Sequence, residues 1–413
     1  MPRFALGEHR LFDKTTRVNL LIGTGHFFSH FYILTLPPLF VAWHETFDVS
    51  YAWLGASVAL MSGTTAVLQT PAGYLVDRYG AKMFLIGGTA LMAIAVAAMA
   101  AATSYWQILV LSALSGVGNS IFHPADYSVL SGSIPRERLG RAFAFHLFTG
   151  HVGFALAPPI VAILALTIGW RLAVLSVGLL GLPVVAAIVL QSSILNEQPQ
   201  GHDGRNAARS VKRLAIFTRP MLLFFAFFAL GAMAQAGMQS WLITVLQTVN
   251  GLSFEIASGA LTAFVGGTLA GVLAGGWIAD RAGARHLLLA TILITISAGS
   301  IFAVGTLSMP SVVILAFLVL SGLCFGASRV SRDLIVKNAA PRGQIGVVFG
   351  FVSAGLPLGQ AITPVPFGYL IDRGYSEYVL VAIAGILILS ILCGGGANIG
   401  ERAQAQEDLE GVR

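Results

Sequence analysis

The chain has 413 residues, of which 56% are hydrophobic and only 10% charged, and its mean hydropathy is +0.81. Soluble domains carry roughly 25% charged residues, so this composition excludes a water-soluble globular protein and predicts an all-α integral membrane protein. The net charge of +6 comes from Lys and Arg residues spread over many loops, so it does not indicate nucleic-acid binding.

Apolar runs of about 20 residues, the length of a bilayer-spanning helix, recur along the whole chain. They predict twelve spans, at 18–42, 51–76, 83–102, 106–131, 141–167, 171–194, 220–247, 255–279, 286–306, 310–336, 343–370 and 378–397. The polar stretch 196–219 is predicted to be a cytoplasmic linker between two six-helix halves, 1–195 and 220–400. Residues 401–413 form a polar tail that we expect to be disordered.

The distribution of Lys and Arg predicts the orientation of the spans. With both termini and the linker in the cytoplasm, 20 of the 24 Lys and Arg residues lie on that side. Cytoplasmic loops are enriched in basic residues, whereas the opposite orientation would invert the ratio. We therefore expect a multi-pass protein of the cytoplasmic (inner) membrane with both ends inside.

A stretch of the fourth span recurs in the tenth. Ser115, Gly116, Pro135 and Gly140 align with equivalent residues of 321–346. The same register sets His123 opposite Arg329 and Asp126 opposite Arg332, in each case 206 residues apart. A duplicated membrane chain with unlike ionisable residues at matching depths predicts a transport pathway between two pseudo-symmetric halves.

A second repeated pattern, G-x-x-x-D-R-x-G, follows spans two and eight. It comprises Gly73, Asp77, Arg78 and Gly80 in the first copy and Gly276, Asp280, Arg281 and Gly283 in the second. Two copies at equivalent loops resemble the signature of the major facilitator superfamily. That resemblance implies the major facilitator fold and assigns the motif residues to a conformational gate that steadies the outward-open state.

Span four carries Gly116-x-Gly-x-Ser-x-Phe-His123-Pro124, and span one carries Ser29-His30-Phe31. Together with Gly153 and Pro158 in span five, these residues resemble the fosmidomycin-resistance protein family, which implies drug/proton antiport. The span-five antiporter motif G-x-x-x-G-P has Ala157 in place of its second glycine. This departure keeps uptake of an organic anion open as the alternative.

Two arginines in span ten are candidate substrate ligands. Ionisable side chains inside a span cost roughly 2.5–3.5 kcal/mol on insertion scales, so they are functional candidates by default. Arg329, and after it Arg332, offers a planar fork that matches a carboxylate or phosphonate. The structural alternative pairs these arginines with Asp333 or Asp126 in a cytoplasmic gate.

The N-terminal half supplies candidate proton carriers. His26 and His30, at i and i+4, share one face of span one and titrate near neutral pH. Asp126 is the acid of span four, and Asp333 lies at matching depth in span ten. Each histidine could instead donate to a neighbouring oxygen, and Asp126 could pair with Arg329 or Arg332. Without a carboxylate or Cys at matching spacing, no metal site is predicted.

Further polar residues of the spans are candidate substrate contacts. His123 precedes Pro124, which is expected to open the helix locally. In span five we favour His151 over His146, because a five-residue separation keeps both from facing one side. Gln235 and Gln239 form a neutral i, i+4 pair in span seven that offers hydrogen bonds to a ligand or a neighbouring helix.

These observations predict a proton-coupled secondary transporter and not an enzyme. The expected substrate is a small anionic or amphiphilic compound, exported in exchange for protons; uptake of an organic anion is the alternative. A transporter-like sensor or assembly protein with no flux of its own is a third hypothesis, which no residue supports. No cofactor is expected, the partners are the substrate, protons and the lipid bilayer, and one bundle is expected to act as a monomer.

Overall fold

The computed structural model describes residues 13–196, 218–282, 285–339, 348 and 351–410. Every regular element in these ranges is a helix. Nine helical stretches of this described part are long and apolar enough to cross a membrane, in line with the apolar composition.

The first predicted span is not one helix. Helix α1 (Lys14–Ile33) ends four residues before Pro37, a 3-10 turn η1 (Pro37–Leu39) follows, and the short helix α2 (Phe40–Phe47) completes the crossing. Pro37 has no backbone N–H to donate to the carbonyl of Ile33, and its ring would clash with that carbonyl in a continuous helix, which explains why α1 ends at Ile33.

Asp13 starts α1 by accepting a hydrogen bond from the backbone nitrogen of Thr16 at 2.8 Å, and Arg138 pairs with its other oxygen at 2.9 Å. The hydrogen bonds from Thr16, followed by Arg138, hold the pKa of this exposed carboxyl below its ordinary value.

The rest of the N-terminal bundle follows the predicted spans, with one interruption at Pro124. Its elements are α3 (Tyr51–Tyr79), α4 (Ala81–Ala98), η2 (Met99–Ala101), α5 (Tyr105–Asn119), α6 (Phe122–Ser133), α7 (Arg136–Leu179), α8 (Gly181–Leu190) and η3 (Ser192–Ile194). The break between α5 and α6, at Ser120 and Ile121, lies where the ring of Pro124 would clash with the carbonyl of a continuous helix. This confirms the predicted opening beside His123.

Helix α7 joins two spans. Its 44 residues would reach about 66 Å at 1.5 Å per residue, twice the hydrocarbon thickness of a bilayer. Gly169 divides it with φ 79° and ψ 156°, a conformation that a residue with a Cβ rarely adopts. The chain therefore turns back at Gly169, between predicted spans five and six.

The C-terminal bundle consists of α10 (Arg219–Thr248), α11 (Phe254–Ala282), α12 (His286–Thr306), α13 (Ser311–Ala339), α15 (Gly355–Ile362), α16 (Pro364–Asp372) and α17 (Glu377–Glu410). The predicted span 343–370 begins outside the described residues, and its described part breaks at Thr363, immediately before Pro364. Helix α17 continues to Glu410. The expectation of a disordered tail was therefore wrong for residues 401–410, where Ala, Gln, Glu and Arg are good helix formers.

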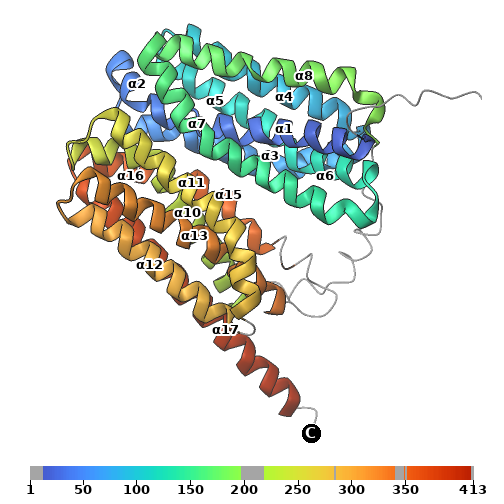
Figure 1. Cartoon of the computed structure of the whole chain (residues 1–413), viewed down its shortest axis with the longest axis vertical. Helices are drawn as coiled ribbons and strands as arrows, with labels where there is room; N and C mark the ends of the chain where they lie inside the picture. Colours follow the sequence, from blue (N-terminus) through green and yellow to red (C-terminus); the bar gives the residue numbers. More distant parts are fainter. Residues whose placement is uncertain (1–12, 197–217, 283–284, 340–347, 349–350, 411–413) are drawn as a thin grey trace, which may run out of the picture.

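Figure 1 shows the helices from α1 to α8 gathered in one bundle and those from α10 to α17 in another. The nine apolar stretches include 137–190, which Gly169 splits in two, while the first and eleventh predicted spans are broken helices. The described helices are thus consistent with the twelve-span major facilitator fold.

The two bundles touch at one end and diverge towards the other, as the ribbons of Figure 1 show. At the touching end, the carboxylate of Asp372 in α16 accepts hydrogen bonds from the backbone nitrogens of Tyr51 and Ala52, at 2.6 and 2.9 Å. Gly55 lets the backbone of Pro364 approach so closely that a Cβ would lie 2.5 Å from its carbonyl oxygen. We call this end the sealed end.

The opposite end, which carries Asn196 and Thr218 on either side of the linker residues, is called the linker end. The first helix of each bundle, α1 or α10, begins there, and α3 and α11 finish there. The repeated G-x-x-x-D-R-x-G motifs therefore lie at this end of the molecule.

Candidate functional site

Arg329 of α13 reaches across to the other bundle. Its guanidinium donates to Oε1 of Gln235 on α10 at 3.1 Å and lies 3.2 Å from Nε2 of His151 on α7. His151 Nδ1 lies 2.8 Å from the carbonyl oxygen of Leu147. A carbonyl only accepts, so Nδ1 carries the proton and Nε2 accepts from the arginine. Both partners of Arg329 are thus neutral.

No carboxylate among the described residues forms an ion pair with Arg329, so the structure does not show the alternative pairing with Asp333 or Asp126. Asp333 is instead held by Arg332, whose Nε and Nη2 donate to the same carboxylate oxygen at 3.1 and 2.9 Å. Arg332 also stacks on the ring of Phe228, with its guanidinium carbon 3.8 Å from the ring centroid. The two arginines thus differ, because Asp333 neutralises Arg332, whereas Arg329 forms no ion pair within the described part of the chain.

Gln235 and Gln239 of α10 are both buried, with 4% and 6% of their surfaces exposed. Gln235 uses its side-chain oxygen on Arg329, so this residue positions the guanidinium. The predicted i, i+4 pair therefore lies in the protein interior and does not face lipid.

Four histidines of the N-terminal bundle form one cluster. His26 and His30 come from α1, His123 from α6 and His146 from α7. The rings of His26 and His146 stack with centroids 3.6 Å apart, and His26 lies 4.4 Å from His30 and 5.3 Å from His123. One ring nitrogen from each of His26, His30 and His123 lies within 4.8 Å of the others. A set of convergent imidazoles thus lies within a single bundle, with His26 buried and His30 and His123 half-buried.

Most ring nitrogens of this cluster have no partner. His26 donates from Nδ1 to the carbonyl oxygen of His146 at 2.8 Å. Its Nε2 makes no hydrogen bond, and neither do Nδ1 of His30, Nδ1 of His123 or either ring nitrogen of His146. Buried polar atoms without partners are rare in folded proteins and call for an explanation.

Asp126 of α6 lies against this cluster and is fully buried. Its Oδ2 is 3.6 Å from Nδ1 of His146, and both of its oxygens lack a hydrogen bond. The alternative in which Asp126 forms a salt bridge with Arg329 or Arg332 is therefore not what the structure shows. Helix α6 packs against α1, α3, α4 and α7 of its own bundle, so its carboxylate faces those helices and not α13.

Two glycines of α7 make room for the histidines of α1. A Cβ on Gly150 would lie 2.6 Å from Cε1 of His26 and 3.2 Å from Cε1 of His30, and a Cβ on Gly153 would clash with the carbonyl oxygen of Phe27. Because His151 follows Gly150, the histidine cluster adjoins the contact between His151 and Arg329. Gly150 and His151 of α7 thus bring the histidine cluster close to the guanidinium of Arg329.

The residues assigned to the gate lie at the linker end. The side chains of Asp77, Arg78, Asp280 and Arg281 are exposed, and Gly80 ends α3 with φ 92°. The two arginines stack on Tyr79 and Trp277 of their own helices, while Gly73 faces Pro124 of α6. Within the described ranges neither aspartate forms a hydrogen bond or ion pair with the other bundle, which agrees with the divergence there. Gly283 lies outside these ranges.

The sequence reasoning ranked His146 below His151, but the structure gives each a different partner. Their separation turns His146 towards Asp126 and His26, and His151 towards Arg329. Asp372 escaped notice altogether. Its only sequence signal is an acid at the end of a span, and its contact with α3 lies 320 residues away along the chain.

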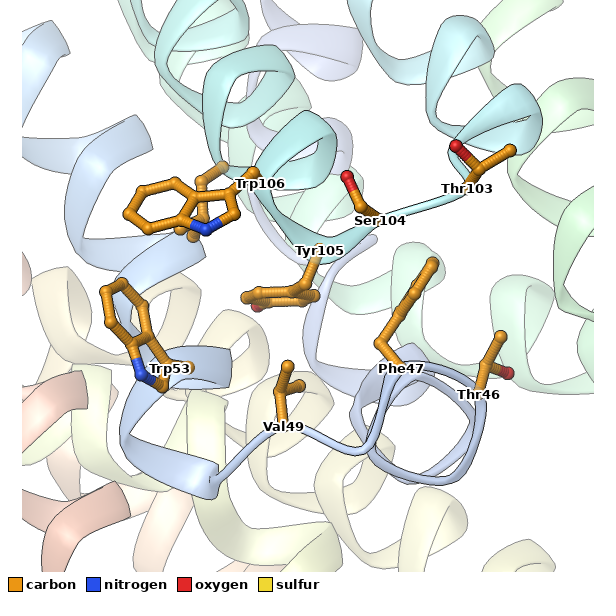
Figure 2. A pocket seen from close by; sticks show the side chains of 9 residues that line it. Thr46, Phe47, Val49, Trp53, Thr103, Ser104, Tyr105 and Trp106 are labelled. Atoms are coloured by element: carbon orange, nitrogen blue, oxygen red, sulfur yellow. The ribbon is translucent and has the colours of Figure 1, made fainter.

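A separate pocket of about 460 Å³ lies at the sealed end. Figure 2 shows Phe47, Trp53, Tyr105 and Trp106 around it, with the rings of Trp53 and Trp106 5.2 Å apart. None of its lining residues is charged. Aromatic residues gather at membrane–water interfaces, so we place this pocket at the membrane–water interface. It has no charged side chain that could neutralise an anion.

The sequence profile of the Major Facilitator Superfamily matches residues 22–274 and 245–397. The chain is 26% identical to the fosmidomycin resistance protein of Escherichia coli K12, over 87% of each chain. It is 24% identical to a probable sulfoacetate transporter of Cupriavidus necator, over 83% of this chain and 84% of the relative. A bacterial homologue of the human lysosomal transporter Spinster has the same fold, with a TM-score of 0.77 at 14% identity over 94% and 97% of the two chains. The chain therefore belongs to the major facilitator superfamily of membrane transporters.

Proposed function

We propose that the protein exports a small anionic compound in exchange for protons, and that Arg329 binds the anionic group. The observation that carries this proposal is the state of Arg329: it is held by two neutral side chains, and no carboxylate in the described part of the chain pairs with it. A guanidinium fixed in this way offers bidentate hydrogen bonds to a carboxylate, sulfonate or phosphonate. Gln235 and His151 would position the guanidinium.

Asp126 is the proposed proton carrier. It faces His146 of α7, adjoins Tyr127 of its own helix, and lies beside the cluster formed with His26, His30 and His123. A carboxylate and an imidazole 3.6 Å apart can exist as a neutral pair or an ion pair. Protonation of the pair changes the charge of the N-terminal bundle, and this bundle contacts Arg329 through His151. Proton binding on one side of α7 would therefore alter anion binding on the other.

The bundles would rock about this site. In the present arrangement Asp372 and the close approach of Gly55 to Pro364 hold the sealed end. If the Lys and Arg bias sets the orientation, the linker end faces the cytoplasm, and the anion binds from there. Release on the other side requires Asp372 to leave the first turn of α3 and the gate residues Asp77 and Asp280 to come together with the opposite helices.

Uptake of an organic anion with protons is the second candidate. One observation favours it: Ala157 replaces a glycine of the antiporter motif. The relative that is a probable sulfoacetate transporter supports an organic anion as the substrate of either candidate. Both candidates use the same anion site, and they differ in the direction of net flux.

The fosmidomycin sensitivity of pump-deficient cells tests the proposal. Cells that make the wild-type protein should become more resistant, and cells that make Arg329→Ala should not, with equal amounts of protein in the membrane. Increased sensitivity with the wild-type protein would instead show inward transport and favour uptake. Resistance that survives in Arg329→Ala would contradict the role of Arg329.

A further inference from the structure

The histidine cluster has a feature that proton exchange at Asp126 does not use. Ring nitrogens from His26, His30 and His123 converge within 4.8 Å of one another. Nε2 of His26, Nδ1 of His30 and Nδ1 of His123 are buried and have no hydrogen-bond partner. From these observations we propose that His26, His30 and His123 bind a divalent transition-metal ion.

The protonation state of His26 fits this role. Its Nδ1 lies 2.8 Å from the carbonyl oxygen of His146 and must donate to it. The proton is therefore on Nδ1, and the lone pair of the unpartnered Nε2 is free to bind a metal. A ligating histidine that donates its other ring nitrogen to a carbonyl or carboxylate is the usual arrangement around protein-bound metals.

The spacing of the nitrogens is close to that of a metal site. A tetrahedral zinc ion with Zn–N distances of about 2.0–2.1 Å places its ligand nitrogens about 3.4 Å apart. The widest separation of 4.8 Å thus has to shrink by about 1.4 Å, which side-chain rotation can supply. Two ligands come from one face of α1 and the third from α6, just after the helix break at Ser120 and Ile121.

The surroundings favour a cation despite the positive charge of Arg329. Asp126 is buried without a cationic partner other than His146, so the charge of a metal ion has a compensating carboxylate in the same bundle. Gly150 leaves the space that the rings of His26 and His30 occupy, and the ring of Phe154 covers His30 at a centroid distance of 4.3 Å. Arg329 is held on the far side of His151 by Gln235.

The donor set indicates the class of metal. Neutral imidazoles suit zinc, copper, nickel and cobalt, whereas calcium and magnesium require oxygen ligands. Three imidazoles leave at least one coordination position for water or an anionic ligand. With a metal ion on these three rings, Asp126 and His146 remain to carry the proton. The inference therefore holds for either direction of transport.

Cobalt binding to the full-length protein in detergent, purified without a polyhistidine tag, tests this inference. Titration of the wild type with Co²⁺ should give one equivalent of bound metal, with the visible absorption of four-coordinate cobalt, and Zn²⁺ should abolish that absorption. His30→Gln and His123→Gln should each weaken Co²⁺ binding at least about 10-fold, because changing even a residue that only hydrogen-bonds to a metal ligand typically costs about 10–100-fold in metal affinity. His44→Gln is the matched control, because His44 lies outside the cluster and bonds to Val49.

Thermal unfolding provides a second readout that separates loss of the site from loss of the fold. Zn²⁺ should raise the Tm of the wild type and of His44→Gln, since a ligand that binds only the folded state stabilises it. It should leave the Tm of His30→Gln and His123→Gln unchanged, while their Tm without metal stays near that of the wild type. Absence of cobalt absorption in the wild type, or equal affinity in the cluster variants, would overturn the inference.

Discussion

The two bundles place different chemistry at equivalent positions of the internal repeat. In the N-terminal bundle, His123 and Asp126 join other histidines in a buried cluster whose polar atoms mostly lack partners. In the C-terminal bundle, the equivalent Arg329 and Arg332 are permanently charged, and each has hydrogen-bond acceptors around it. The two halves share one duplicated fold but differ in charge behaviour. The N-terminal bundle can gain or lose a cation, whereas the C-terminal bundle keeps its positive charge.

The contact between the halves connects these two environments. Gly150 and His151 are adjacent on α7, one against the histidine cluster and the other against Arg329. A small movement of α7 would therefore change the surroundings of both the histidine cluster and Arg329. We therefore expect changes in the C-terminal bundle to alter anion binding and changes in the N-terminal bundle to alter coupling to protons.

The largest effect is expected from Arg329→Ala. Removing one partner of a desolvated charge pair costs about 2–5 kcal/mol, so anion affinity should fall about 30-fold or more. Arg329→Lys should be intermediate, because an ammonium lacks the planar fork. Equilibrium binding of fosmidomycin or sulfoacetate to the purified protein measures this. Arg373→Ala, at the sealed end, is the control, and equal affinities in all three variants would remove Arg329 from the site.

Gly150→Ala should disturb both environments at once. Its Cβ would lie 2.6 Å from Cε1 and 2.8 Å from Nδ1 of His26, so the ring must move and α7 must shift. Forcing an extra methyl group into a packed interior costs about 1–3 kcal/mol. We expect a lower Tm and reduced transport. Gly87→Ala on α4 is the matched control, since no atom lies within 4 Å of its Cβ position; equal behaviour of the two variants would contradict the packing argument.

A smaller, conformational effect is expected from Asp372→Ala. Loss of a helix N-cap costs about 1 kcal/mol, which would shift the balance roughly fivefold towards a state with the sealed end open. Distances between spin labels on α3 and α16 would report the shift. Glu45→Ala, an exposed acid at the same end, should leave the distances unchanged. If Asp372→Ala leaves the distance distribution unchanged, other contacts hold the sealed end closed.

The smallest effect is expected from Asp333→Asn. The side chain of Asp333 is 49% exposed and pairs with its neighbour Arg332, and an Asn side-chain oxygen can still accept hydrogen bonds from that guanidinium. Transport rate and its dependence on pH should stay near those of the wild type. A flattened pH profile would restore Asp333 as a proton carrier and weaken the contrast between the two bundles.

Much of this arrangement could be predicted from local sequence, and the rest depended on neighbours in space. Pro124 predicted the break beside His123, because a missing donor acts within one turn. The break at Pro37 and Pro38 had the same signal and was overlooked. The repeat located Arg329 and Asp126, but it left open whether charges of opposite halves pair. Packing of α6 against its own bundle decided otherwise, and no local pattern encodes that packing.

The partners of individual side chains were the least predictable feature. Gln235 and His151 come from two different helices, and either could have faced another neighbour. The three nitrogens of His26, His30 and His123 converge only because α1 and α6 cross at this depth, which spacing along one helix cannot reveal. Sequence therefore identified the ionisable residues of the spans, whereas their grouping into an anion site and an imidazole cluster required the fold.

The division of labour between the bundles is tested most directly by transport into proteoliposomes, measured in two modes. One mode follows accumulation driven by a pH gradient, and the other follows exchange of labelled for unlabelled anion without a gradient. Asp126→Asn should lose gradient-driven accumulation and keep exchange, because anion binding at Arg329 remains, while Arg329→Ala should lose both. If Asp126→Asn keeps gradient-driven accumulation, or if Arg329→Ala keeps exchange, the proposed assignment of proton and anion to opposite bundles is contradicted.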